Sequence, residues 1–189
     1  MNDITNSGPE RAVESAVGRS LAGKYLTFRL DREEYGLEIL KVREIIGLMG
    51  ITKVPRTPHY IRGVINLRGK VIPVLDLRAK FGMDVIADTE ETCIIVVDVQ
   101  NTGNSIMMGI LVDAVSEVLD IQAGEIEEPP TFGSEVDTRF ILGIGKVKNS
   151  VKILLDIDRV LTGVDFSAAE GMEAAVESVT DAELTASLQ

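Results

Sequence analysis

Short apolar runs separated by polar breaks predict a chain made mostly of β-strands. Leu26, Phe28 and Leu30 alternate with more polar neighbours, which is the period of a half-buried strand. A polar break at 31–34 leads into a second alternating stretch, so residues 25–39 are expected to form a hairpin. Later runs rich in Val and Ile are equally short: 61–67, 70–77, 92–99, 105–112, 140–147 and 151–157. This pattern predicts an all-β fold of the barrel or sandwich type.

Turn residues and two helical patterns mark the strand ends. Hairpin turns are expected at Gly69, Gly103 and 149–150. Pro73 inside a strand run predicts an edge strand, because proline cannot donate to a sheet ladder. Short helical turns are expected at 39–45 and 77–81. Asp76 and Asp156 end strands in equivalent contexts, which suits N-caps of a following helical turn.

The chain also contains an internal repeat. Residues 35–46 (YGLEILKVREII) align with 108–119 (MGILVDAVSEVL), and 61–81 align with 141–161 without gaps. Five of the 21 positions in the second block are identical, against the one or two that ordinary residue usage would give. The two halves are therefore expected to share one topology.

The repeat predicts a domain at 22–163 made of two small barrels, at about 22–90 and 91–163. Each half is too small for comfortable stability alone, so the halves are expected to share a core, with a cleft between them as a place for a partner. Residues 1–20 lack strand alternation and are expected to form a flexible tail with one helical turn around 10–17. Residues 167–189 are acidic and Ala-rich, and a docked helix and a solvated tail are both open.

Charge and composition narrow the classes of function. The 189 residues carry a net charge of −11, of which −5 comes from residues 167–189. This acidity disfavours nucleic acid and anionic membranes as partners. One Cys and one His cannot build a His/Cys zinc site or an intrachain disulfide. With no apolar run near ~18 residues and no signal-peptide pattern, a soluble cytoplasmic protein without direct membrane insertion is expected.

No residue pattern supports catalysis. Residues 18–24 match the start of a phosphate-binding loop, but Tyr25 follows where Ser or Thr should bind magnesium, and a strand rather than a helix comes next. His59 has no nucleophile motif nearby, and Cys93 opens an apolar strand, so a surface histidine and an inert buried thiol are expected. We therefore predict no enzymatic activity, no cofactor and no metal.

Surface binding has better support. Glu44 is a charge within an apolar stretch, and it recurs as Glu117, so a role in the fold and a partner contact are both open. Arg68 lies at a hairpin tip, where its planar guanidinium suits a carboxylate on a partner. The halves differ at Arg62 and at 66–69. Features present in one copy are better candidates for specific function, although drift after duplication would give the same differences.

Several motifs together resemble the CheW family of bacterial chemotaxis adaptors. They follow in order as EEYGLEILKVREI at 33–45, VPRTP at 54–58, IRGVINLRG at 61–69, PVLDLRAKF at 73–81, VDAVSEV at 112–118 and FILGIG at 140–145. One such element is weak evidence, but the ordered series over about 22–163 is highly specific. The acidic segment 167–189 is not part of the family pattern.

The resemblance implies two five-stranded SH3-like barrels and a non-catalytic scaffold. Such a scaffold joins the regulatory domain of the histidine kinase CheA, which has the same fold, to the cytoplasmic tips of chemoreceptors, the methyl-accepting chemotaxis proteins. It implies a cytoplasmic protein recruited to membrane-anchored receptor arrays, where self-association is open. An apolar cleft between the barrels would suit a receptor helix.

The resemblance also implies site residues. Val42, Glu44, Gly63 and Arg68 match family binding positions, and the comparison of the halves adds Arg62 and Asn66. Gly63 recurs as Gly143, so backbone geometry is its first expected role. Two other functions stay open: an adaptor of a parallel pathway, for surface motility or second-messenger control, and a disfavoured nucleotide binder or enzyme.

Overall fold

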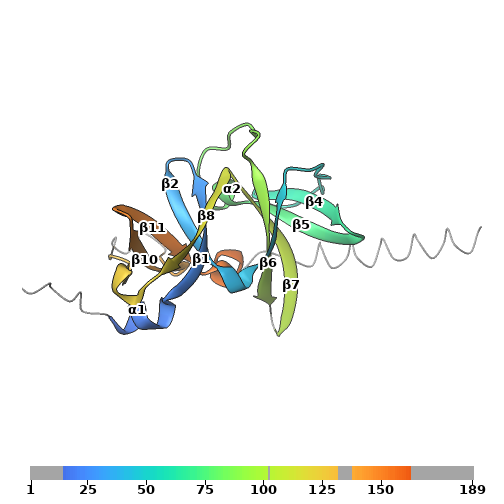
Figure 1. Ribbon diagram of the computed structural model, residues 1–189. Coiled ribbons are helices and arrows are strands. Elements are labelled where there is room, and N and C mark those ends of the chain that lie inside the picture. Colours follow the sequence, from blue (N-terminus) through green and yellow to red (C-terminus); the bar gives the residue numbers. More distant parts are fainter. Residues whose placement is uncertain (1–14, 102, 132–137, 163–189) are drawn as a thin grey trace, which may run out of the picture.

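The computed structural model describes residues 15–101, 103–131 and 138–162, and most of them form β-strands (Figure 1). The strands are β1 (Gly23–Leu30), β2 (Glu33–Glu38), β3 (Val42–Gly47), β4 (Ile61–Leu67), β5 (Lys70–Asp76), β6 (Cys93–Asn101), β7 (Asn104–Val112), β8 (Ala114–Ile121), β9 (Ile126–Glu127), β10 (Ile141–Val147) and β11 (Ser150–Leu155). The helical elements are α1 (Ala16–Leu21), η1 (Ile39–Lys41), α2 (Leu77–Lys80), η2 (Ala123–Glu125) and α3 (Ile157–Leu161). The predicted all-β class is confirmed, while the predicted acidic tail at 167–189 lies outside the described residues.

The strands form two sheets, one beside the other in Figure 1. The first sheet has the order β8-β1-β2-β11-β10-β9, and the second has the order β3-β6-β7-β5-β4. Neighbouring strands are antiparallel except for β2 with β11 and β5 with β7, which are parallel. The second sheet has the five strands that the resemblance implies, and the first has a sixth because the two-residue β9 pairs with β10.

Each sheet takes strands from both halves of the repeat. β1 and β2 are completed by β8–β11, and β6 and β7 are completed by β3–β5. The predicted division of the barrels at 90/91 is therefore wrong for the sheets. The alternation of apolar and polar residues determines which face of a strand is buried, but not which strand lies beside it. The exchange of strands between the two halves could therefore not be predicted from this pattern. The repeat itself is confirmed by the pairing, because β2 pairs with β11 as its counterpart β7 pairs with β5.

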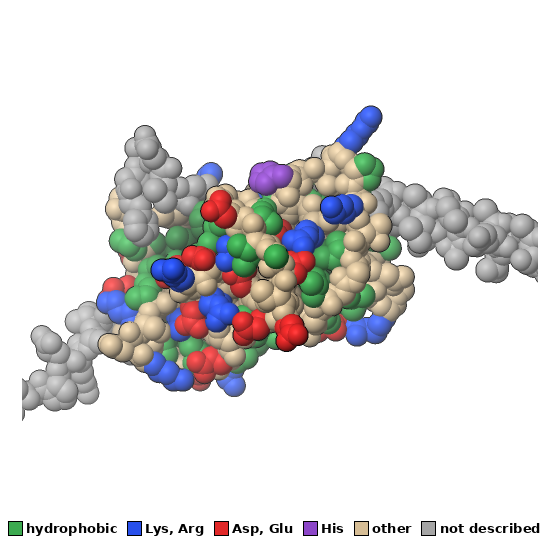
Figure 2. Space-filling view, turned by 90° about the horizontal axis from the view of Figure 1, so that it is seen from above, with side chains coloured by type: hydrophobic (Ala, Val, Ile, Leu, Met, Phe, Trp, Pro, Cys, Tyr) green, Lys and Arg blue, Asp and Glu red, His purple; other side chains and the backbone are tan. Residues whose placement is uncertain are grey.

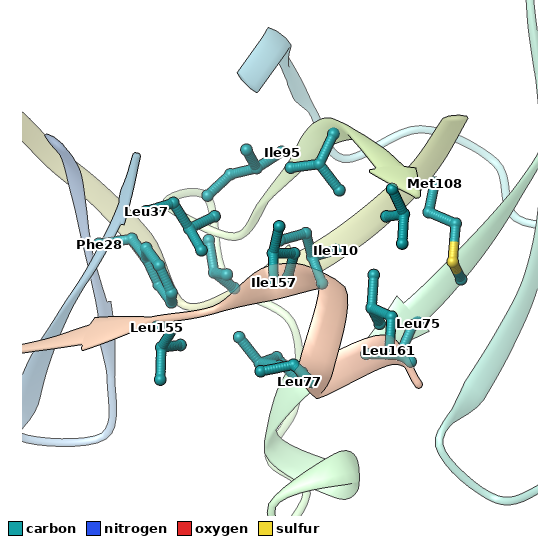
Figure 3. Close-up of a cluster of buried hydrophobic side chains, with 14 of the residues drawn as sticks. Phe28, Leu37, Leu75, Leu77, Ile95, Met108, Ile110, Leu155, Ile157 and Leu161 are labelled. Carbon is teal, nitrogen blue, oxygen red and sulfur yellow. The ribbon is translucent and has the colours of Figure 1, made fainter. Parts of the chain in front are cut away.

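Three hydrophobic clusters hold the fold together. One lies inside the first sheet, with Tyr25, Ile121 and Leu154 among its members, and one lies inside the second sheet, with Ile65 and Val96. The largest cluster fills the space between the sheets. Figure 3 labels ten of its members, which come from both sheets and from helices α2 and α3: Phe28, Leu37, Leu75, Leu77, Ile95, Met108, Ile110, Leu155, Ile157 and Leu161. The predicted shared core is therefore present.

This layered core explains two differences from the predicted strands. β1 is not half-buried: Tyr25 packs inside the first sheet while Leu26 and Phe28 enter the central cluster, so both faces are covered. Pro73 is not on an edge strand, since β5 lies between β4 and β7. The parallel ladder with β7 begins at Val74, so the missing N–H of Pro73 falls outside that ladder.

Helices α2 and α3 are capped by Asp76 and Asp156, as predicted. Asp76 Oδ1 accepts a hydrogen bond from the Ala79 N–H at 3.2 Å, and Asp156 Oδ1 accepts one from the Arg159 N–H at 3.1 Å. The helical turn expected at 39–45 was wrong in extent, because only Ile39–Lys41 form a single 3₁₀ turn before β3 begins.

Residues 16–20 of α1 belong to the segment 1–20 that was expected to be a flexible tail with a helical turn around 10–17, and residues 1–14 of that segment lie outside the described residues. Ser15 caps α1 by accepting a hydrogen bond from the Gly18 N–H at 2.9 Å. The Tyr25 hydroxyl donates to the Leu21 carbonyl at 2.6 Å and ties the helix to β1. Burial, with the charge of Glu38 nearby, raises the pKa of Tyr25 to about 12. Among the described residues no helix is long and apolar enough to cross a membrane.

Candidate partner-binding surface

The six residues predicted to bind partners all lie on the second sheet or its turns: Val42 and Glu44 on β3, Arg62, Gly63 and Asn66 on β4, and Arg68 in the β4–β5 turn. β3 and β4 are the two edges of that sheet. The Arg68 guanidinium nevertheless forms an ion pair with the Glu44 carboxylate. The sheet must therefore curl until its edges approach each other, as in a small barrel.

The β4–β5 turn fixes the backbone of Arg68 and leaves its side chain in solvent. Arg68 and Gly69 have φ values of 52° and 86°, the two left-handed residues of a tight hairpin turn. Asn66 Oδ1 accepts a hydrogen bond from the Gly69 N–H at 2.8 Å. The Arg68 side chain is 73% exposed, so its guanidinium can be shared between Glu44 and a carboxylate on a partner.

The same ion pair recurs in the first sheet. Lys148, in the β10–β11 turn, lies 3.5 Å from the carboxylate of Glu117 on β8. These residues are the repeat counterparts of Arg68 and Glu44. A charge pair across the sheet edges is therefore shared by both halves, and what distinguishes the second sheet is the planar, five-donor fork of arginine.

Arg62 and Gly63 hold the second sheet together. Arg62 bridges two carboxylates, Asp76 at 3.1 Å and Asp88 at 2.5 Å, and so ties β4 to the start of α2 and to the loop before β6. Gly63 has a φ of 144°, and a Cβ there would lie 2.1 Å from the Thr52 carbonyl oxygen. The backbone role expected for Gly63 is thus explained by the close passage of the chain at Thr52.

Sequence reasoning missed an exposed apolar stretch that runs from η1 past the end of β3. Leu40 is 93% exposed, and Ile45, Leu48 and Met49 are also exposed. β3 is an edge strand, so unpaired backbone groups lie beside these side chains. We call Ile45, Leu48 and Met49, with Glu44 and Arg68, the β3 surface, and treat Leu40 of η1 separately. The sequence feature that could have revealed this surface is Ile45, an apolar residue at a position of β3 that faces outward.

Sequence reasoning also missed two ion pairs that hold the links between the sheets. η1 links β2 to β3, and its Lys41 Nζ lies 2.5 Å from Asp158 of α3. Asp113 links β7 to β8, and it accepts two hydrogen bonds from Arg78 of α2, at 2.7 and 2.6 Å. We call these the Lys41–Asp158 and Arg78–Asp113 clamps.

The second clamp controls the charge state of Asp113. Burial by itself raises the pKa of Asp113, but hydrogen bonds from Arg78 and from the Asp31 N–H at 2.7 Å, together with the charge of Arg78, outweigh burial and hold this pKa below its usual value. The hydrogen bonds to Asp113, opposed by burial, in turn raise the pKa of Arg78. Both groups stay charged at neutral pH.

The cleft expected between the barrels is filled in its interior by the central hydrophobic cluster. Near this seam a surface hollow of about 450 Å³ is lined by Lys80, Phe81, Arg139, Phe140, Arg159, Val160 and Thr162. A second hollow, of about 550 Å³, lies between residues 53–62 and 85–88, beside Arg62.

The histidine and the cysteine of the chain, His59 and Cys93, both pack against neighbouring residues of the fold. His59 Nε2 lies 3.3 Å from the Ala79 carbonyl, and its ring meets Tyr60 edge-on. Burial raises the pKa of the half-buried Cys93 thiol, which disfavours the reactive thiolate. No cluster of three potential metal ligands occurs within the described residues. On the face that carries His59, basic and acidic side chains are intermixed rather than gathered by sign (Figure 2).

Comparisons with known proteins agree with the motif series. A family model described as a CheW-like domain matches residues 24–165. "Chemotaxis protein CheW" of Klebsiella aerogenes is 36% identical over 160 residues, covering 85% of this chain and 94% of that protein. The protein of the same name from Rhizobium meliloti is 35% identical over 144 residues, covering 76% of this chain and 90% of that protein.

A solved structure gives the same result. The scaffolding protein TtCheW from Thermoanaerobacter tengcongensis superposes with a TM-score of 0.66 at 38% sequence identity. The match covers 75% of this chain and 94% of that one.

Proposed function

Because this chain belongs to the CheW family and has the chemotaxis scaffold role of that family, we propose that it couples chemoreceptors to the histidine kinase CheA. The scaffold would lower no chemical barrier. It would hold kinase and receptor in a fixed relation, so that the receptor conformation biases the kinase equilibrium. Several weak interfaces in one array would suffice, because each contact raises the effective concentration for the next.

The β3 surface is the observation that carries this proposal. It combines exposed apolar side chains, an open strand edge and an exposed arginine already paired with Glu44. Apolar patches beside unpaired backbone are places where another protein docks. We propose that the regulatory domain of the kinase, a domain of the same fold, meets this surface edge to edge.

The receptor tip is proposed to lie where η1 crosses from one sheet to the other. Leu40 projects from this link with 93% exposure, and Val42 follows it at the margin of the central cluster. A single protruding leucine next to a packed seam suits the apolar face of a receptor helix. The two partners would then contact neighbouring parts of one segment, which places their relative geometry under the control of η1 and β3.

The test is co-sedimentation with receptor tips and CheA, each alone and both together, with kinase activity as a second readout. Leu40→Asp is expected to reduce receptor capture and to leave binary CheA binding within twofold of the wild type. Glu44→Lys and Arg68→Glu are each expected to weaken CheA binding. Glu117→Lys and Lys148→Glu, which break the equivalent pair of the first sheet, are the matched controls.

A charge swap separates a partner contact from an internal role. Glu44→Arg combined with Arg68→Glu restores an ion pair within the chain but reverses the charge offered to a partner. If the pair serves only the fold, the double variant recovers CheA binding. The proposal expects binding to stay impaired while the melting temperature recovers. Wild-type assembly by the swap and by Leu40→Asp would refute the proposed sites, and capture of a different kinase would favour a parallel pathway.

A further inference from the structure

The hollow of about 450 Å³ near the seam is basic and partly aromatic. Three of its seven lining residues are cations, Lys80, Arg139 and Arg159, and none of the seven is acidic. The rings of Phe81 and Phe140, also in the lining, stack at 5.2 Å. The site therefore offers positive charge around an apolar floor, in a chain whose net charge is −11.

Two of the cations, Lys80 and Arg159, have contacts that still leave their charge at the hollow. Arg159 Nε lies 3.3 Å from Asp156, and its Nη1 donates to the Arg139 carbonyl at 3.1 Å. Lys80 Nζ lies 4.3 Å from the centre of the Tyr60 ring, and burial lowers its pKa. A carboxylate that entered the hollow would meet the Lys80 ammonium and the Arg159 guanidinium, and at Arg159 it would compete with the carboxylate of Asp156.

The acidic C-terminal segment of the chain begins at the hollow. Thr162 is both a lining residue of the hollow and the last described residue before the C-terminal segment. From 163 onward the sequence has six acids and no Lys or Arg, beginning with Asp165 and Glu170. Eight residues span at most about 28 Å, so Glu170 is within reach of the hollow from Thr162. A short tether also gives an effective concentration of about a millimolar, so even a weak site would be occupied.

We propose that the basic hollow binds the acidic C-terminal segment, residues 163–189, of the same chain. The carboxylates of Glu170 and Glu173 would meet Lys80 and Arg159, and the apolar residues between the acids would face the Phe81–Phe140 floor. This is an intramolecular docking site, separate from the β3 surface, and it does not depend on the proposed partners. It assigns a role to an acidic segment that the family motif series does not include.

The test uses the full chain with a nitroxide label on Ser178→Cys, in a Cys93→Ala background that removes the native thiol. Docking is expected to broaden the ¹⁵N amide signals of Phe81, Phe140 and Thr162, and 1 M salt is expected to restore them. In a mixed sample, labelled ¹⁴N chains and unlabelled ¹⁵N chains report only contacts between molecules. The proposal expects no broadening there, and broadening of these signals in the mixed sample would overturn it in favour of docking onto a second copy.

Paired variants identify the basic groups. Lys80→Gln with Arg159→Gln is expected to abolish the broadening, as is Glu170→Gln with Glu173→Gln. Arg19→Gln with Lys24→Gln removes the same two charges from exposed positions on α1 and β1 and is expected to change nothing. Unchanged melting temperatures show that the folded chain is being compared. Broadening that is absent, lies elsewhere or survives both sets of substitutions would refute the site.

Discussion

The Arg78–Asp113 clamp should contribute more to stability than any exposed ion pair of the chain. The Arg78 side chain is 8% exposed and the Asp113 side chain 16%, and two hydrogen bonds join them. Asp113→Ala would leave a buried guanidinium whose remaining partners are the Asp84 carbonyl at 3.0 Å and the exposed Asp31 at 3.6 Å. Breaking a buried pair by removing one partner costs about 3–5 kcal/mol, and the remaining contacts place Asp113→Ala near about 3 kcal/mol. That is a loss of roughly 150-fold in the folding equilibrium.

The chain provides its own comparison in the Lys41–Asp158 clamp. It holds the other link between the sheets, but its side chains are 28% and 29% exposed, so solvent screens the pair. Lys41→Met is therefore expected to cost at most about 1 kcal/mol. Replacing both members of the buried clamp, Arg78→Met with Asp113→Leu, should cost less than Asp113→Ala alone, because no unpaired charge stays in the interior.

The assay is urea unfolding at pH 7, followed by far-ultraviolet circular dichroism, because the chain has no tryptophan. Urea is preferred to guanidinium because it does not screen charges. Similar m-values for the wild type and the three variants are needed before the free energies are compared. The reasoning fails if Asp113→Ala costs no more than Lys41→Met, or if the apolar double variant is as unstable as the single one.

Three further outcomes follow from the same contacts. The clamp with Arg78 lowers the pKa of Asp113 on folding, so wild type should be more stable than Asp113→Asn. This difference in unfolding free energy should be fully present above the unfolded pKa of about 4 and should shrink as pH falls through the lower folded pKa. Urea unfolding from pH 6 to 3 measures it. Gly63→Ala should cost about 3 kcal/mol by thermal unfolding, since its Cβ would collide with the Thr52 carbonyl at a φ that L-residues rarely adopt. Asp156→Ala should cost about 1 kcal/mol as a lost helix cap, whereas Asp76→Ala should cost more in the same melts because Asp76 also accepts from an arginine of β4.

The local features of the fold were predictable because they depend on neighbours in sequence. The caps at Asp76 and Asp156 need an aspartate and the N–H three residues later, and both are present. The turn at Arg68-Gly69 needs a residue tolerant of positive φ, and glycine supplied that signal. The shared core followed from the repeat and from the small size of each half.

The partner of each strand was not predictable from the pattern. β2 would be equally well buried beside β5 of its own half or β11 of the other, because apolar alternation looks the same in both arrangements. The partners within each ion pair were not predictable from the sequence either. Arg68 and Glu44 were chosen separately as binding candidates, and only the curl of the second sheet brings them together. The Arg78–Asp113 clamp joins residues 35 positions apart with no motif to connect them.

The exchange of strands between the halves gives a physical reason why this fold suits a scaffold. Neither sheet can form from one half alone, so the halves of the repeat cannot separate without unpairing β2 from β11 and β7 from β5. The two sheets are in turn joined by the central hydrophobic cluster. The two links that cross between the sheets, at η1 and at Asp113, are each clamped to a short helix by an ion pair. A partner bound at the β3 surface is therefore held in a nearly fixed orientation to one bound at η1, the link that the Lys41–Asp158 clamp ties to α3. If that rigidity matters, Asp113→Ala should loosen the coupling of the kinase to the receptor under conditions where both still bind.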